Sequence, residues 1–243
     1  ITYDFSNTMS ETNVVFRDWD NNYRSLTRDI MAEYERILDV DFVESAPNGS
    51  NRHVELGLAD SIPGSTVGIG GYSYGWGNGG IDYNGYQYTE ALSTQSYLEV
   101  FAHELGHALG LKHTFSGSPI IPSAYDHEGY SVMSYSGDPG PSRETGYSGN
   151  WTILNEEELA ILDVVALQYV WGAALDNNTG NTTYGNGTAM TRTIIDGGGT
   201  DTLDLGSWQT DKMEMIIDLG RGGLSEVGRD TGGRPDFLRF AID

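Results

Sequence analysis

Three of the five histidines in this chain lie within eleven consecutive residues, HELGHALGLKH at positions 103–113. Because His103 and His107 are four residues apart, they share one face of a helix and can direct two imidazoles at one metal ion. We expect Gly110 to end this helix, since glycine accepts a left-handed turn, and that turn lets His113 approach the same metal. Three neutral imidazoles leave a fourth ligand position open, which is typical of a catalytic zinc site.

The glutamate inside this motif, Glu104, is offset around the helix from the two histidines. It can therefore accept a proton from a water at the metal without being a ligand, which is the role of a general base. The chain contains no cysteine, and this excludes thiolate catalysis and cysteine-ligated zinc or iron–sulfur sites. The sequence thus predicts one catalytic zinc ion held by histidines, with Glu104 as the catalytic base.

Residues 103–113 resemble the extended zinc motif of the metzincin peptidases. The segment SVMSY at residues 131–135 resembles the methionine turn of one metzincin group, the serralysins, which are secreted bacterial proteases. The resemblance implies that Met133 forms a hydrophobic floor under the zinc. It also implies that Tyr135 is an additional, displaceable zinc ligand whose hydroxyl stabilises the tetrahedral intermediate. Serralysins usually have a proline after the third histidine, where this chain has Thr114, so the course of the following loop is expected to differ.

A second resemblance lies near the end of the chain, where DGGGTDTLD at residues 196–204 is similar to the entry of the serralysin calcium-binding β-roll. It implies one or more structural calcium ions, held by carboxylates and by backbone oxygens. The implied ligands are Asp196, Asp201 and the backbone oxygens of Gly198, Asn178, Gly180 and Thr182. Because only one repeat-like segment is present, we expect a processed or truncated form that lacks the rest of the β-roll. By the same resemblance, we expect that it starts after a propeptide that has been removed.

The elements that position these residues follow from hydrophobic periodicity. We expect a strand over 1–5, a helix carrying Trp19 to Leu38, strands over 41–44 and 53–58, a helix capped by Ser96 and Glu99, and a helix from Asn155 to Gly172. The fold class is therefore α+β, with a metzincin catalytic domain of mixed twisted sheet and helices over 1–172. A small all-β calcium-binding segment is expected over 173–243.

The alternation of residues 66–70 is compatible with a flexible loop or with an irregular edge strand. By analogy with the family, this edge strand would bind an extended peptide by β-augmentation. The predicted substrate-binding residues are Thr66, Val67, Gly68, Ile69 and Gly70.

The composition excludes several classes of partner. The 243 residues carry a formal net charge of −22, which argues against binding to nucleic acid or to anionic membranes. No apolar run approaches the roughly 20 residues that span a bilayer, so membrane insertion is not expected. The resemblance implies a monomeric zinc endopeptidase, secreted and extracellular, that hydrolyses extracellular proteins and has a proteinaceous inhibitor as a further partner.

Two other functions are compatible with part of the sequence. One is a calcium-dependent adhesion or scaffold module with a structural zinc site, against which Glu104 and the lack of a cysteine ligand argue. The other is a metzincin of astacin or matrixin type. Ser134, between Met133 and Tyr135, and the β-roll-like segment argue against that second alternative.

Overall fold

The computed structural model describes residues 1–6, 9, 13–46, 53–77, 80–128, 130–136, 159–185, 191–204, 215–220, 223–227 and 238–242. The chain divides into two compact units. The first contains Ile1–Glu35 and Val40–His113, and the second contains Arg36–Asp39 and Thr114–Asp243. The predicted boundary between residues 172 and 173 stays a prediction.

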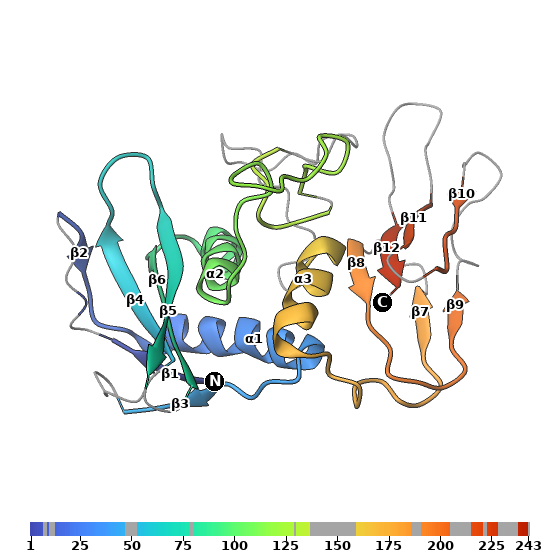
Figure 1. Cartoon of the computed structure of the whole chain (residues 1–243), viewed down its shortest axis with the longest axis horizontal. Helices are drawn as coiled ribbons and strands as arrows, with labels where there is room; N and C mark the ends of the chain where they lie inside the picture. The colour runs from blue at the N-terminus through green and yellow to red at the C-terminus, as the bar shows by residue number, and fades with distance from the viewer. Residues whose placement is uncertain are drawn as a thin grey trace. The chain divides into compact units, whose positions relative to one another are not determined.

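The first unit is built on a twisted mixed sheet (Figure 1) with the strand order β3-β1-β4-β6-β5, to which β2 adds by pairing with β4. Parallel ladders join β1 to β3, β1 to β4 and β4 to β6, whereas β5 and β6 form an antiparallel hairpin. β5 therefore lies at the edge of this sheet. The strands are β1 (Thr2–Phe5), β2 (Val15–Phe16), β3 (Val43–Glu44), β4 (Val54–Ser61), β5 (Gly68–Gly77) and β6 (Gly80–Glu90).

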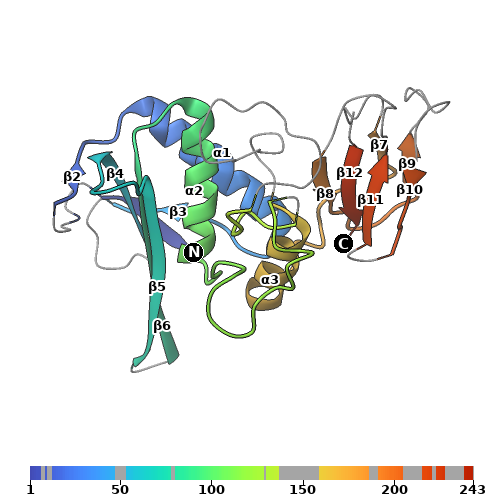
Figure 2. The same cartoon turned by 90° about the horizontal axis from the view of Figure 1, so that it is seen from above.

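Two helices of this unit cover one face of the sheet, as Figures 1 and 2 show. Helix α1 (Asn21–Ile37) begins after Asp20, whose carboxylate accepts the N–H groups of Asn22 and Tyr23. Such a cap satisfies backbone donors that a helix start leaves without a partner. Helix α2 (Thr94–Ala108) has Ser93 at its N-cap position, without a side-chain cap bond. The predicted capping box of Ser96 and Glu99 is therefore wrong, because the helix begins earlier and both residues lie inside it.

Polar contacts hold α2 against α1. The Tyr34 hydroxyl donates to the Ala102 carbonyl at 2.8 Å, and the hydroxyls of Thr27 and Tyr97 lie 2.8 Å apart in the core. Tyr97 is fully buried, so its hydroxyl needs this partner. These contacts fix the helix that carries two of the three motif histidines.

The second unit contains helix α3 (Ile161–Trp171) and short strands. Strands β10, β11, β12 and β8 form one sheet in that order, and β7 pairs with β9 in parallel. The predicted start of α3 at Asn155 lies outside the described residues. The sequence also predicts short strand-like runs at residues 193–195, 202–205 and 215–217, and these overlap β8, β9 and β10. It does not predict β11 and β12. The bounds are β7 (Thr183–Gly185), β8 (Thr191–Ile194), β9 (Thr202–Asp204), β10 (Met215–Ile216), β11 (Gly223–Val227) and β12 (Leu238–Ile242).

The mixed sheet and its helices confirm the α+β class, and the calcium-binding character of the C-terminal segment stays a prediction. None of the described helices is long and apolar enough to cross a membrane.

Candidate metal centre

The end of α2 has the turn that the motif requires. The Leu111 N–H donates to the Gly106 carbonyl at 2.9 Å, and the Gly110 N–H donates to the His107 carbonyl at 3.0 Å. This pair of bonds is the Schellman arrangement that closes a helix with a left-handed residue. Gly110 is that residue, with φ +112°, which a side chain rarely adopts. The predicted helix-ending role of Gly110 agrees with this geometry.

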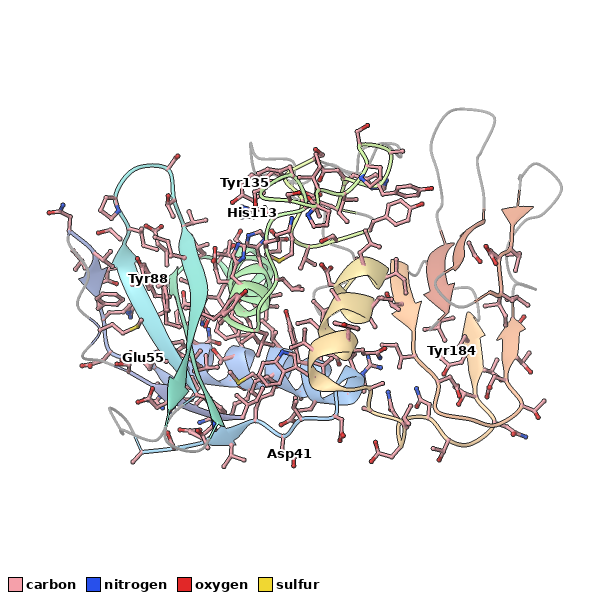
Figure 3. The ribbon with its side chains drawn as sticks, viewed as in Figure 1. Asp41, Glu55, Tyr88, His113, Tyr135 and Tyr184 are labelled. Atoms are coloured by element: carbon pink, nitrogen blue, oxygen red, sulfur yellow. The ribbon has the colours of Figure 1, made fainter. Side chains whose placement is uncertain are left out.

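The reversal brings the three motif histidines together. The Nε2 atom of His113 lies 3.3 Å from Nε2 of His103 and 3.0 Å from Nε2 of His107. His103, His107 and His113 are the only group of three or more possible metal ligands among the described residues, with ligand atoms all within 4.8 Å of one another. Figure 3 shows His113 next to helix α2. Three ring nitrogens therefore converge on one point.

The protonation of these imidazoles suits a metal. Burial lowers the pKa of His107. The pKa of His113 is also lowered, first by burial and then by the charge of the neighbouring His107. The Nδ1 atom of His107 lies 2.9 Å from the Leu111 carbonyl oxygen. Because a carbonyl can only accept, Nδ1 carries the proton and Nε2 keeps its lone pair. Neutral nitrogen donors with a backbone partner behind them fit zinc.

Glu104 lies against β5, where two glycines make room for it. A Cβ atom added at Gly68 would be 2.5 Å from Val100 Cγ1 and 2.8 Å from Glu104 Oε1. A Cβ atom added at Gly70 would collide with the backbone carbonyl of Glu104. Burial raises the pKa of Glu104 to about 8, partly offset by a hydrogen bond from the Gly70 backbone. The close approach of helix and strand thus buries Glu104, which is 7% exposed and directly follows His103 in the sequence.

The five predicted substrate-binding residues lie at the start of the edge strand. Thr66 and Val67 precede β5, and the Val67 carbonyl accepts the Glu90 N–H at 2.9 Å. Gly68, Ile69 and Gly70 are the first three residues of β5. The structure thus resolves the choice between loop and strand for residues 68–70. Their binding of substrate stays a prediction.

The methionine-turn segment belongs to the second unit. Met133 is 1% exposed, and its N–H donates to the Ser131 hydroxyl at 3.0 Å. Tyr135, labelled in Figure 3, is 56% exposed, and its ring packs against Phe115 with centroids 5.0 Å apart. The turn and the burial of Met133 agree with the resemblance, and the roles of Met133 and Tyr135 at zinc stay predictions.

The six predicted calcium ligands lie on two neighbouring segments of the second unit. The Asp201 carboxylate accepts the Thr182 N–H at 2.9 Å. The Asp196 carboxylate accepts the Gly198 N–H at 2.9 Å and the Tyr184 hydroxyl at 2.5 Å. Asn178 has φ +49°, and the Gly180 carbonyl accepts the Thr182 hydroxyl at 3.2 Å. The structure therefore brings the two segments together.

Two polar residues near the methionine turn were missed by the sequence reasoning. Asp163, 1% exposed, accepts the Ser131 hydroxyl at 2.6 Å and the Val132 N–H at 2.8 Å. Its signal was a single acidic residue in an otherwise apolar helical run, ILDVVAL. Asp126 accepts the hydroxyls of Thr114 and Ser134, and nothing in its sequence context marks this.

One of the other histidines also differs from expectation. The sequence context predicts that His127 is an ordinary surface or strand residue without a role. It lies in a loop, 6% exposed, with its ring 4.7 Å from that of Tyr130. Aromatic packing accounts for its burial.

Comparison with known proteins agrees with the geometry of the site. A model of metallo-peptidase family M12 matches residues 3–148. The metallopeptidase AprA of Pseudomonas marginalis is 26% identical over 94% of this chain and 54% of its own length. Serralysin C of Dickeya chrysanthemi is 30% identical over 63% of this chain and 35% of its own length. Serralysin G of the same organism is 23% identical over 94% of this chain and 53% of its own length. The chain thus spans about half of these relatives or less, and the predicted serralysin-type resemblance is confirmed.

Proposed function

Because the chain belongs to metallopeptidase family M12, we propose that it is a zinc-dependent endopeptidase that hydrolyses peptide bonds of extracellular proteins. The observation that carries this proposal is the convergence of three imidazole Nε2 atoms beside a buried carboxyl group. His103, His107 and His113 would hold the zinc ion. The family and the relatives do not favour the scaffold module or the astacin or matrixin type.

The chemistry follows from the residues around this point. Zinc held there would supply a Lewis acid and lower the pKa of a coordinated water toward about 7. Glu104 accepts a proton at its carboxylate as the scissile carbonyl is attacked, and then transfers it to the leaving amine. A carboxyl group whose pKa burial raises to about 8 can both accept and donate a proton near neutral pH. By resemblance to the serralysins, the Tyr135 hydroxyl would stabilise the tetrahedral intermediate, and Met133 would form a hydrophobic floor under the zinc.

The substrate would bind along β5. A sheet edge carries backbone groups that can pair with an extended peptide, and β5 is the edge strand of its sheet. Gly68 and Gly70 belong to this strand, and both lie against Glu104 of helix α2. A peptide paired with residues 66–70 would therefore pass close to the proposed base.

We also propose that the second unit binds calcium between residues 178–182 and 196–201. Support comes from the parallel pairing of β7 with β9 and from the absence of space for a side chain at Gly199, where a Cβ atom would be 2.5 Å from the Gly180 carbonyl oxygen. Closely spaced backbone oxygens with two aspartates are ligands that calcium prefers. Calcium should raise the melting temperature of the wild type, and the Asp201→Asn variant should lose this increase.

The test of the enzyme assignment uses Glu104→Gln. This change keeps the shape of the side chain and removes its proton-accepting function, so casein cleavage should fall by about 10²-fold to 10⁴-fold while one zinc per chain is retained. Glu99→Gln, on the same helix, is the matched control and should keep activity. Chelation should stop cleavage, and zinc should restore it. A zinc-free preparation that cleaves normally, or full activity in Glu104→Gln, would refute the assignment.

The remaining expectations concern the whole protein. We propose an extracellular location, since the resemblance is to a group of secreted bacterial proteases. The proteinaceous inhibitor and the monomeric state stay predictions.

A further inference from the structure

Asp126 joins two segments of the second unit that are distant in the sequence. Its Oδ1 atom accepts hydrogen bonds from the Thr114 hydroxyl and, at 2.8 Å, from the Ser134 hydroxyl. Thr114 is 5% exposed and Ser134 is fully buried. Hydrogen bonds from hydroxyls to a carboxylate are stronger than bonds between neutral groups. The carboxylate thus fastens the two segments to each other.

Further contacts join the same two segments. The Thr114 N–H donates to the Met133 carbonyl at 3.4 Å. One residue further on, the Phe115 ring packs against the Tyr135 ring with an interplanar angle of 55°. The Ser134 hydroxyl also accepts the Ser136 N–H at 3.1 Å. Residues 114–115 and 133–136 therefore lie side by side, with Asp126 as the shared acceptor.

These contacts explain how the chain proceeds without a proline after the third histidine. A proline would restrict φ but would offer neither an N–H nor a hydroxyl group. Thr114 supplies both, and they bind Met133 and Asp126. The segment that follows His113 is thus held by side-chain and backbone hydrogen bonds.

We propose that Asp126 is a positioning residue for catalysis, a role that rests on the proposed function. It holds the backbone that directly follows His113 and the backbone that directly precedes Tyr135. Through Ser134 it sets the position of the Tyr135 side chain, which the proposed mechanism uses at the oxyanion. Asp126 itself does not touch the reacting atoms in this proposal.

The test compares four variants with the wild type. Asp126→Ala removes the shared acceptor, and it should lower kcat about tenfold to a hundredfold with KM changed less than about twofold. Thr114→Val and Ser134→Ala each remove one hydroxyl and should cause smaller losses, which do not add to the loss in Asp126→Ala. Thr114→Ser keeps the hydroxyl and should keep kcat. Asp176→Ala, an exposed aspartate of the same unit, is the control.

Two readouts separate positioning from general stability. In a Tyr135→Phe background, Asp126→Ala should lower kcat less than it does in the wild type, because one of the two groups that Asp126 positions is absent. The visible spectrum of the cobalt(II)-substituted protein should change in Asp126→Ala and remain unchanged in Thr114→Ser. If Asp126→Ala does not fold, the two single-hydroxyl variants carry the same test.

The outcomes distinguish this proposal from the proposed function. Wild-type protein that binds zinc and cleaves no peptide would refute the function, whereas the cobalt spectra would still test Asp126. An active wild type with unchanged kcat and unchanged spectra in Asp126→Ala and Thr114→Val would overturn the positioning role. So would equal losses for Asp126→Ala with and without the Tyr135 hydroxyl.

Discussion

The carboxyl group of Asp163 provides a test of the electrostatics beneath the methionine turn. Burial raises its pKa from 3.8 to about 7, although the Ser131 hydroxyl and the backbone N–H groups of Val132 and Ala160 oppose the increase. Because the folded pKa lies above the unfolded one, the folded state binds the proton more tightly. Stability from this group is therefore present at low pH and is lost as the pH rises from about 4 to about 7.

The size of this effect follows from the pKa values. A change from 3.8 to about 7 corresponds to about 4 kcal/mol in total, of which about 3 kcal/mol lies between pH 5 and pH 8. The perturbation is Asp163→Asn. Its amide resembles the protonated acid, since one atom donates to Ser131 and the other accepts from Val132. The variant should match the wild type near pH 4 and become more stable than the wild type by several kcal/mol at pH 8.

The assay is urea unfolding of both proteins at several pH values from 5 to 8, followed by circular dichroism. A difference of about 3 kcal/mol moves the midpoint by about 1 to 3 M urea. The subtraction of variant from wild type cancels the other titrating groups. Asp176→Asn changes an exposed aspartate of the same unit and should show no such pH-dependent difference.

Two results would refute the reasoning about Asp163. A difference between the wild type and Asp163→Asn that is constant from pH 5 to pH 8 would mean that burial does not raise the pKa of Asp163 above about 5 in the folded chain. In the same assay extended to lower pH, a wild type that gains stability relative to the variant as the pH rises toward about 4 would mean that the three donors outweigh burial and lower the pKa of Asp163.

Three further predictions concern the first unit. Gly68→Ala places a Cβ atom 2.5 Å from Val100 Cγ1, so the free energy of unfolding should fall by about 1–3 kcal/mol in thermal unfolding and casein cleavage should decrease. Adding Val100→Ala should recover the stability, and a double variant without recovery would contradict the steric cause. Thr27→Val removes the buried partner of the Tyr97 hydroxyl and should cost about 1–3 kcal/mol in urea unfolding, with a cost near zero contradicting the hydrogen bond. At Gly110 an added Cβ atom would meet no atom closer than 3.9 Å, but the backbone has φ +112°. Gly110→Ala should therefore lower the free energy of unfolding by about 1–3 kcal/mol through backbone strain and should weaken zinc binding in a chelator competition. Wild-type values in both measurements would argue against the turn.

Sequence periodicity located the main elements of the first unit but not all of their boundaries. The pattern from Trp19 to Leu38 corresponds to α1, and the run at residues 53–58 lies in β4. The predicted start of α2 lies later than the observed start, because Ser93, Thr94 and Ser96 all have hydroxyl groups that can cap a helix. The local sequence does not identify which of them precedes the first turn. The glycine-rich segment at residues 66–70 was ambiguous because its alternation is short and glycine occurs in loops as well as in irregular edge strands.

The sequence alone determined the chemistry of the candidate zinc site. A spacing of four residues places His103 and His107 on one helix face, and a glycine at position 110 permits the turn that returns His113. These are local consequences of helix geometry and of one backbone conformation, so they need no tertiary information.

Only the tertiary structure decided which groups pack against Glu104 and which groups bind the methionine-turn segment. Gly68 and Gly70 come from a strand far from Glu104 in the sequence, and they matter because a helix approaches that strand closely. Asp126 and Asp163 bind residues 114, 131, 132 and 134 across gaps of 8 to 32 residues. Such partners leave no periodic signal, because hydrogen bonds between distant segments depend on the folded path of the chain and not on the spacing of residues along it.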